Sequence, residues 1–149
     1  MVKIKKLNRK ITEKELKQFE KKNKIRLTEK YKDFLLKWNR GSPEPCLFDI
    51  SKDQGTSVLN VFNGIDAQYD DLEEVIDIYE FRLPEGFIPI ADDPSGNAIC
   101  LGTKVPYYDH IYFWDHEQES ETPDDMSNMY FLASDIDAFL NMLYEDDES

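Results

Sequence analysis

The amino-acid sequence predicts an α+β fold in which a mixed, mainly antiparallel sheet is flanked by helices. Four segments carry apolar residues at helical spacing, and six short apolar runs bounded by turn formers have the length of strands. Two of these runs are separated only by a turn-forming stretch, as in a hairpin. A chain of 149 residues that is 40% hydrophobic and 13% aromatic fits one domain around one core. We therefore expect residues 1–149 to form a single domain.

Two helices are predicted near the N-terminus. The segment 12–23 begins with Thr12 and Glu15, the spacing of a capping box. The segment 28–38 carries apolar residues at i, i+3, i+4 and i+7, which is the core-facing spacing: Tyr31, Phe34, Leu35 and Trp38. Residues 39–41 end this helix, and the Ser-Pro-Glu-Pro stretch at 42–45 predicts a rigid turn.

The middle of the chain predicts two strands and a third helix. The strands cover residues 46–50 and 56–62, and an Asn-Gly pair marks a turn after the second. Residues 70–80 return to helical spacing. Carboxylates are expected in the first turn of this helix, where the helix dipole favours anions: Asp70, Asp71, Glu73 and Glu74.

The C-terminal half predicts a hairpin, two more strands and a last helix. Residues 87–91 and 98–101 pair across the turn-forming stretch 92–97, and Pro89 is tolerable only at an edge or a bulge. Strands at 111–114 and 129–133 follow, and Ser134 is predicted to cap the final helix. Residues 145–149, of which the first four are acidic, predict a frayed tail.

Charge is segregated along the chain, whose formal net charge is −13. Residues 1–40 hold 15 of the 18 basic residues and only 5 of the 31 acidic ones, a local net charge of +10. Residues 41–149 have a net charge of −23. Such a field repels nucleic acids and anionic membranes and attracts basic proteins. We expect a protein partner, with no nucleic-acid and no membrane partner, although acidity that serves only solubility would look the same.

The sequence also predicts a cytoplasmic protein. The two cysteines, Cys46 and Cys100, form no CxxC pair and are typical of buried thiols in a reducing compartment. The charged N-terminus lacks the apolar stretch of a signal peptide, and no apolar run approaches the ~20 residues of a membrane span.

The residue pattern predicts that the protein is not an enzyme and binds no cofactor. The chain has two histidines, six glycines and no motif for a nucleophile or a phosphate-binding loop. A cluster that could bind a metal lies close together in sequence: Asp109, His110, Asp115 and His116. Tight Cys or His pairs are absent, so we expect no metal. The aromatic residues Trp38, Phe113 and Trp114 could line a ligand pocket, but their spacing is more typical of a core.

The acidic segment 115–125 is the predicted partner-binding region. It contains no basic residue and follows directly on an apolar strand, which would present it on a rigid support. The predicted binding residues in and next to it are Asp115, His116, Glu117, Glu119 and Glu121. Asp92 and Asp93, expected at the tip of the neighbouring hairpin, would extend the same surface.

Three blocks of the sequence resemble the SUKH superfamily. Residues 25–41 are similar to its "lP..yk.fl...NGg" signature, residues 88–101 to its "iPia.d..Gd.icld" hairpin, and residues 111–117 to its "vyfwdHe" strand. Residues 134–143 match the closing helix, so the resemblance spans nearly the whole chain in the order of the family. Three positions depart from the pattern: Thr28 stands in place of proline, Arg40 interrupts the Asn-Gly pair, and Asn97 replaces an acid.

The resemblance implies a function as well as a fold. Bacterial members of the superfamily are immunity proteins that neutralise a polymorphic toxin, often a nuclease, and eukaryotic relatives are regulatory scaffolds in cell-wall signalling. The first hypothesis is therefore an immunity protein that binds a cognate toxin. The alternative is a regulatory scaffold domain that binds a small molecule or metal around Trp38, Trp114 and His116.

Overall fold

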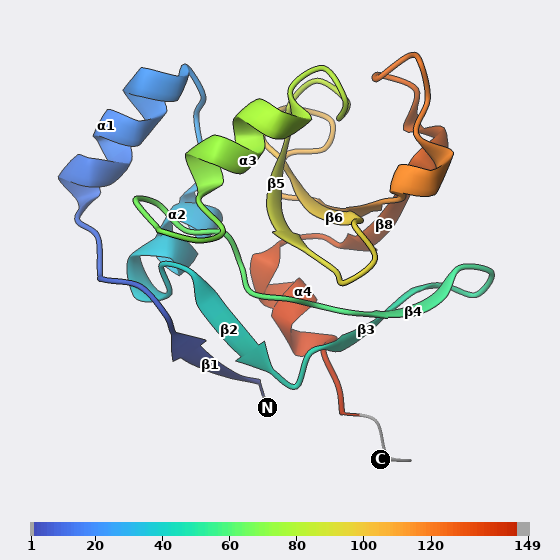
Figure 1. Ribbon diagram of the computed structural model, residues 1–149, viewed down its shortest axis with the longest axis horizontal. Helices are drawn as coiled ribbons and strands as arrows, with labels where there is room; N and C mark the ends of the chain where they lie inside the picture. Colours follow the sequence, from blue (N-terminus) through green and yellow to red (C-terminus); the bar gives the residue numbers. More distant parts are fainter. Residues whose placement is uncertain (1, 146–149) are drawn as a thin grey trace.

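A computed structural model describes residues 2–145 and confirms the α+β class (Figure 1). The largest sheet has four antiparallel strands in the order β5 (Phe87–Asp92), β6 (Ala98–Gly102), β7 (Ile111–Trp114) and β8 (Met129–Ala133). Two smaller antiparallel sheets pair β1 (Lys3–Lys6) with β2 (Gly41–Glu44) and β3 (Leu47–Ser51) with β4 (Gly55–Val58). The strands therefore form three sheets, and each named strand pair is antiparallel.

Four α-helices and two short 3-10 helices complete the described residues. The α-helices are α1 (Glu13–Asn23), α2 (Glu29–Lys37), α3 (Leu72–Tyr79) and α4 (Ile136–Asn141), and the 3-10 helices are η1 (His116–Gln118) and η2 (Met126–Asn128). The capping box of Thr12 and Glu15 at the start of α1 is confirmed. Thr28 caps α2 by accepting a hydrogen bond from the backbone N–H of Tyr31 at 3.3 Å, which explains why threonine can replace proline there. The predicted tail lies, from residue 146 on, outside the described residues.

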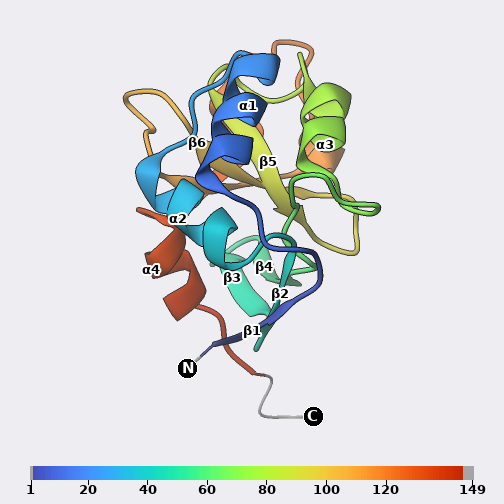
Figure 2. The ribbon, with the colours of Figure 1, turned by 90° about the vertical axis from the view of Figure 1, so that its left-hand side faces the viewer.

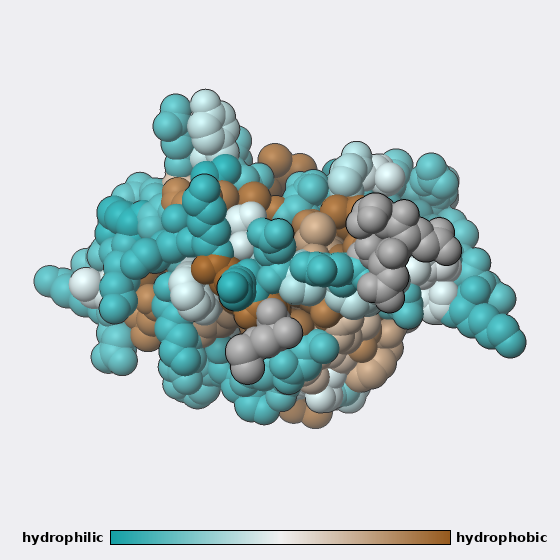
Figure 3. Space-filling view, turned by 90° about the horizontal axis from the view of Figure 1, so that it is seen from below, coloured by the Kyte–Doolittle hydropathy of each residue, from teal (hydrophilic) through white to brown (hydrophobic). Residues whose placement is uncertain are grey.

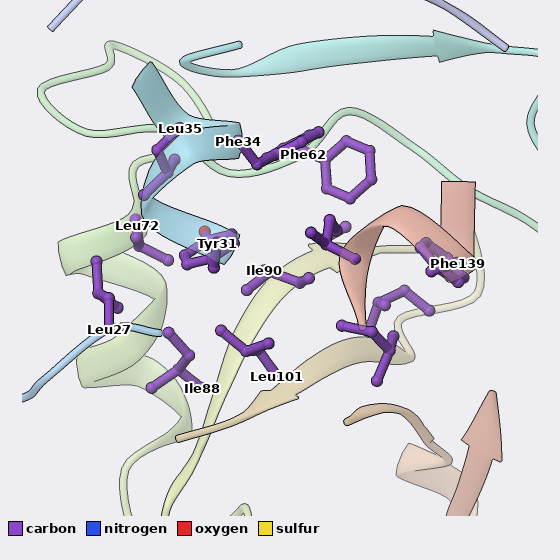
Figure 4. Packing of buried hydrophobic residues seen from close by; sticks show 14 of the residues in the cluster. Leu27, Tyr31, Phe34, Leu35, Phe62, Leu72, Ile88, Ile90, Leu101 and Phe139 are labelled. Carbon is purple, nitrogen blue, oxygen red and sulfur yellow. The ribbon is translucent and has the colours of Figure 1, made fainter. Parts of the chain in front are cut away.

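The main hydrophobic core lies between one face of the four-stranded sheet and the helices (Figure 4). The apolar stripe of α2 points into it, as its spacing predicts, with Tyr31, Phe34 and Leu35 buried and Trp38 partly buried. Figure 4 shows Tyr31 of α2 beside Ile90 of β5, with Phe139 of α4 at the other end of the cluster. The sheet contributes the alternating residues of its first face: Ile88, Ile90, Ile99, Leu101, Ile111 and Phe113.

A second, smaller cluster lies on the opposite face of the same sheet. Trp114 is its largest buried side chain, and the ring of Tyr79, at the end of α3, packs edge-on against it at 5.4 Å. The remaining buried members are Leu83, Phe87, Ala98, Cys100 and Met129. Because Trp38 packs against the first cluster and Trp114 lies in the second, the two tryptophans do not share a pocket.

The prediction of a rigid turn at residues 42–45 was wrong, because residues 41–44 form β2. This strand pairs with β1, a strand that the sequence pattern did not predict, and Pro43 lies opposite Ile4. Each strand of a two-stranded sheet has a free edge, where the missing N–H of proline costs no ladder hydrogen bond. The prediction for Pro89 is confirmed, since β5 is an edge strand of its sheet and its register shifts between Pro89 and Ala91.

Three boundaries also differ from the prediction. The strand expected at 56–62 ends at Val58, and the following residues run along β5, where Asn63 N–H donates to the carbonyl of Ile90 at 2.7 Å. The final helix is capped by Asp135 instead of Ser134, because the Asp135 carboxylate accepts from the N–H of Ala138. Asp70 lies outside α3, since Asp71 is its N-cap and Asp70 pairs with Arg40.

The most basic helix and the acidic segment after β7 lie at opposite ends of the molecule (Figure 1). The lysine-rich α1 lies at one end and the segment 115–128, drawn in orange, at the other. Figure 2 shows α1 and α3 side by side, in agreement with the ion pair of Lys22 with Glu73 at 2.9 Å. The face seen from below, near the described ends of the chain, is mostly hydrophilic, with hydrophobic residues visible in separate areas (Figure 3).

Candidate functional site

The turn between β5 and β6 is organised around Asp93, whose side chain is buried although it is charged. Asp93, with 4% of its surface exposed, accepts hydrogen bonds from the N–H groups of Ser95 (3.0 Å) and Asn97 (2.9 Å). Its second oxygen accepts from the Asn97 side chain (3.0 Å) and from the hydroxyl of Ser57 in β4 (2.7 Å). Asp93 thus fixes the turn and ties it to the β3–β4 hairpin.

The segment that follows β7 is attached to the same turn. Asp115 is buried and caps η1 by accepting a hydrogen bond from the N–H of Glu117 at 3.0 Å. The side-chain oxygen of Asn97 accepts from the backbone N–H of His116 at 3.0 Å. An asparagine can serve both neighbours because it donates to Asp93 and accepts from His116. This double role gives a physical reason for the departure from the acid of the SUKH pattern.

A polar cleft of about 230 Å³ lies between the hairpin, the turn and η1. Three predicted binding residues line it: Asp93, Asp115 and Glu117. The β3–β4 hairpin supplies Gln54, Thr56 and Ser57 on the opposite side, and Phe113 of β7 is also part of the lining. The structure therefore brings these three residues together, although two of their carboxylates already serve the fold.

The other predicted residues occupy different surroundings. Asp92 is the last residue of β5, and its side chain is half-buried. Burial raises the pKa of its carboxyl group, whereas the hydrogen bond from the Asn60 side chain (3.0 Å) lowers it by a smaller amount. Glu119 forms a two-pronged ion pair with Arg82 at 3.0 and 3.1 Å, and the Arg82 guanidinium lies over the ring of Trp114 at 5.2 Å. Glu121 is exposed, as is Glu117 in the cleft, and neither forms an ion pair within residues 2–145.

Sequence reasoning did not identify Ser57, Asn60 and Arg82 as parts of this site. Each holds one of the predicted acidic residues in place. Arg82 carried a usable signal, because it is one of only three basic residues in the segment 41–149. Ser57 and Asn60 carried none, since small polar residues in a predicted strand point to no particular partner.

The negative field of the acidic end is only partly neutralised. Of the three basic residues in the segment 41–149, Arg82 pairs with Glu119 and Lys104 with Glu85, which leaves Lys52. Basic residues of the N-terminal region also pair with carboxylates of residues 41–149, and these pairs are Arg9–Asp66, Lys22–Glu73, Lys30–Asp135 and Arg40–Asp70. The surface near the cleft therefore keeps an excess of negative charge.

The residues considered for chemistry are not gathered into one site. His110 precedes β7 and His116 follows it, so the four residues of this strand separate them by roughly 13 Å or more. Within residues 2–145, no group of three or more His, Cys, Asp or Glu side chains could hold a metal ion. Cys46 and Cys100 are free thiols, and burial raises the pKa of Cys100, which disfavours the nucleophilic thiolate.

Comparisons with known proteins place this geometry in a family context. The SMI1 / KNR4 family (SUKH-1) matches residues 10–142. The chain is also similar to the SPbeta prophage-derived uncharacterized protein YokK of Bacillus subtilis (strain 168), with 27% identity over 152 aligned positions. That alignment covers 91% of this chain and 76% of the relative. Over the part of the chain that the structure describes, no helix has both the length and the apolar character needed to cross a membrane.

Proposed function

This chain belongs to the SMI1 / KNR4 family (SUKH-1), and we propose that it is an immunity protein that binds and neutralises a cognate toxin. Domains of the SUKH family are generally immunity proteins of toxin systems and generally have no enzymatic activity. The proposed partner is a basic nuclease domain. The proposed mode of action is direct binding, without a metal, a cofactor or a covalent step.

The observation that carries the proposal is the set of carboxylates at one end of a well-anchored sheet. Hydrogen bonds from Ser57 and Asn97 to Asp93 fix the β5–β6 turn. The Asn97 side chain also accepts a hydrogen bond from the N–H of His116 in η1, so the segment from Asp115 onward starts from a fixed position. A preorganised surface loses less conformational entropy on binding than a mobile loop does. The exposed Glu117 and Glu121 would meet basic side chains of the partner there.

A nuclease supplies the complementary chemistry. It must present basic residues to the phosphates of its substrate. An acidic inhibitor that occupies this surface competes with nucleic acid for the same cations, and its long-range field accelerates the encounter. Neutralisation then follows from steric and electrostatic exclusion of the substrate.

Co-expression in cells tests this function directly. We expect the chain to restore growth of cells that express the cognate toxin domain, taken from a large secreted protein encoded immediately upstream of its gene. An unrelated immunity protein expressed at the same level should give no rescue. Equal killing with and without the chain, for every toxin domain encoded nearby, would refute the proposal.

A double charge reversal tests the role of the acidic surface. In Glu117→Lys combined with Glu121→Lys, the association rate constant for the toxin domain should fall by about tenfold at low salt, because the attractive field weakens. The loss should shrink as ionic strength rises, since the Debye length falls to about 8 Å at 0.15 M salt. Stopped-flow or surface-based kinetics over a salt series measures both effects.

The matched control reverses two acidic residues at the other end of the molecule. Glu13 in α1 and Asp33 in α2 are exposed, form no ion pair within the described residues, and give the same change in net charge when replaced by lysine. If both double variants slow association equally, net charge alone is responsible and the acidic surface is not the binding site. Asp115 and Glu119 are left intact, because their reversal would disturb η1 and the Arg82 pair.

A further inference from the structure

Three aromatic side chains form a continuous, partly exposed surface on the second face of the four-stranded sheet. The ring of Tyr112 in β7 contacts Phe131 of β8 at 5.6 Å and Tyr107 at 5.7 Å between centroids. The ring of Phe87 packs beneath, at 5.4 Å from Tyr107 and 5.3 Å from Tyr112. Phe131 has 52% of its surface exposed. We refer to Tyr107, Tyr112 and Phe131 as the aromatic surface.

The loop before β7 is held down on the sheet so that Tyr107 can join this surface. Gly102 makes the close approach possible, because a Cβ atom at this position would lie 1.9 Å from the backbone oxygen of Tyr107. The N–H of Asp109 also donates to the carbonyl of Gly102 at 2.9 Å. The placement of Tyr107 is therefore built into the backbone and is not an accident of one side-chain rotamer.

A hollow of about 240 Å³ adjoins the aromatic surface. Its lining includes Phe87 and Tyr107 on one side and Glu85, Lys104 and Val105 on the other. This volume suits one long side chain, whose aliphatic part would lie against the rings. Its cationic end would replace the exposed Lys104 as the partner of the Glu85 carboxylate, a pair that is 3.3 Å apart in the free protein.

The acidic segment borders the same region. The carboxylate of Asp124 accepts a hydrogen bond from the N–H of Glu85 at 2.7 Å, and Glu119 pairs with Arg82 just before it. The border of this uncharged aromatic centre is polar, and its three carboxylates (Glu85, Glu119 and Asp124) outnumber its two basic residues (Arg82 and Lys104). An aromatic centre with a polar border has the composition of a protein-binding hot spot with its rim. The charge of the border is complementary to a basic protein.

We propose that the aromatic surface is the apolar centre of the toxin interface, and that the adjoining hollow receives a lysine or arginine side chain of the toxin. This inference rests on the proposed immunity function and adds to it the contact that sets the lifetime of the complex. The acidic residues govern the encounter, whereas the buried rings slow dissociation.

Binding kinetics of Phe131→Ala test the inference, with the toxin domain that the chain rescues as the probe. We expect at least a tenfold weaker Kd, arising mainly from faster dissociation and with little dependence on salt. Tyr69→Ala is the matched control, because Tyr69 is an exposed aromatic residue (64%) that lies against Arg40, away from the aromatic surface. The Kd of this variant should change less than twofold. Val105→Lys, in an exposed loop position, should also weaken binding at least tenfold by blocking the hollow and repelling a basic partner.

The possible outcomes separate the inference from the proposed function. If both Phe131→Ala and Val105→Lys bind the toxin domain as tightly as the wild type does, the inference is overturned and the immunity function still stands. A concentration-dependent dimer that Phe131→Ala dissociates, with unchanged toxin affinity, would assign the surface to a second copy and overturn it as well. No wild-type binding to any neighbouring toxin domain would overturn both. Thermal unfolding of each variant confirms that the fold is retained, and Val105→Lys provides the test if Phe131→Ala does not fold.

Discussion

Replacing Phe62 by alanine is expected to lower the free energy of unfolding by about 3–5 kcal/mol. Phe62 is 0% exposed, and its ring packs against those of Phe34 in α2 and Phe139 in α4, with centroid distances of 4.8 and 6.4 Å. Truncation would leave a cavity between these helices and the sheet, which the backbone cannot close because Phe62 is also bridged to Ala91 of β5. Equilibrium unfolding in urea measures the change.

Phe81→Ala removes the same atoms from an exposed position and serves as the control. Phe81 is 82% exposed, so its truncation should change the stability by less than about 0.5 kcal/mol. Similar losses in the two variants would contradict the placement of Phe62 in the core. Both variants are measured at the same pH and salt concentration.

Replacing Asp93 by alanine is expected to cost about 2–4 kcal/mol, the second largest effect. The substitution removes the acceptor of four hydrogen bonds and leaves donors of Ser57, Ser95 and Asn97 without their partner. The turn and the β3–β4 hairpin should both loosen, because the Ser57 hydroxyl connects them. Urea unfolding gives the magnitude, and amide hydrogen exchange should show faster exchange in residues 93–97.

The neighbouring substitution Asp92→Asn is the control and should have the opposite sign. Burial raises the folded-state pKa of Asp92, so the ionised carboxylate destabilises the fold at neutral pH. The variant should gain on the order of 0.5 kcal/mol at pH 7, a small value because the half-buried site is screened by solvent. The gain should disappear below about pH 4, where the carboxyl group is protonated in both states. A loss from Asp92→Asn as large as that from Asp93→Ala would show that a charge is needed at both positions.

Local patterns predicted most of the elements correctly. Helical spacing placed α2 and α3, and turn formers placed the β5–β6 hairpin to within a residue or two. The errors occur where pairing with a distant segment decides the conformation. β2 is a strand because β1 pairs with it, and the stretch after Val58 lies along β5 as single bridges and hydrogen bonds instead of continuing β4.

Arg40 illustrates a signal that can be understood only in the folded chain. It stands where the SUKH pattern has glycine, and it adopts a left-handed backbone conformation with φ of 63°, which glycine adopts at the least cost. Its guanidinium pairs with Asp70 at 3.0 and 3.1 Å. Asp70 lies 30 positions away in the sequence, so no local pattern could relate the two residues.

The sequence by itself determined the α+β class, the capping box of α1, the core-facing residues and the location of the acidic segment, because these depend on spacing and composition within one stretch of chain. The roles of individual carboxylates were decided only by the tertiary structure. Asp93 and Asp115 are buried and hold backbone groups, Glu119 is paired with Arg82, and Glu117 and Glu121 are exposed. The aromatic surface was likewise hidden in the sequence, since Tyr107, Tyr112 and Phe131 meet only when strand register and the close approach at Gly102 bring them together. The sequence shows a carboxylate or an aromatic ring in the same way wherever the residue lies in the fold. Its burial and its contacts across the sheet decide whether it supports the fold or is exposed to a partner.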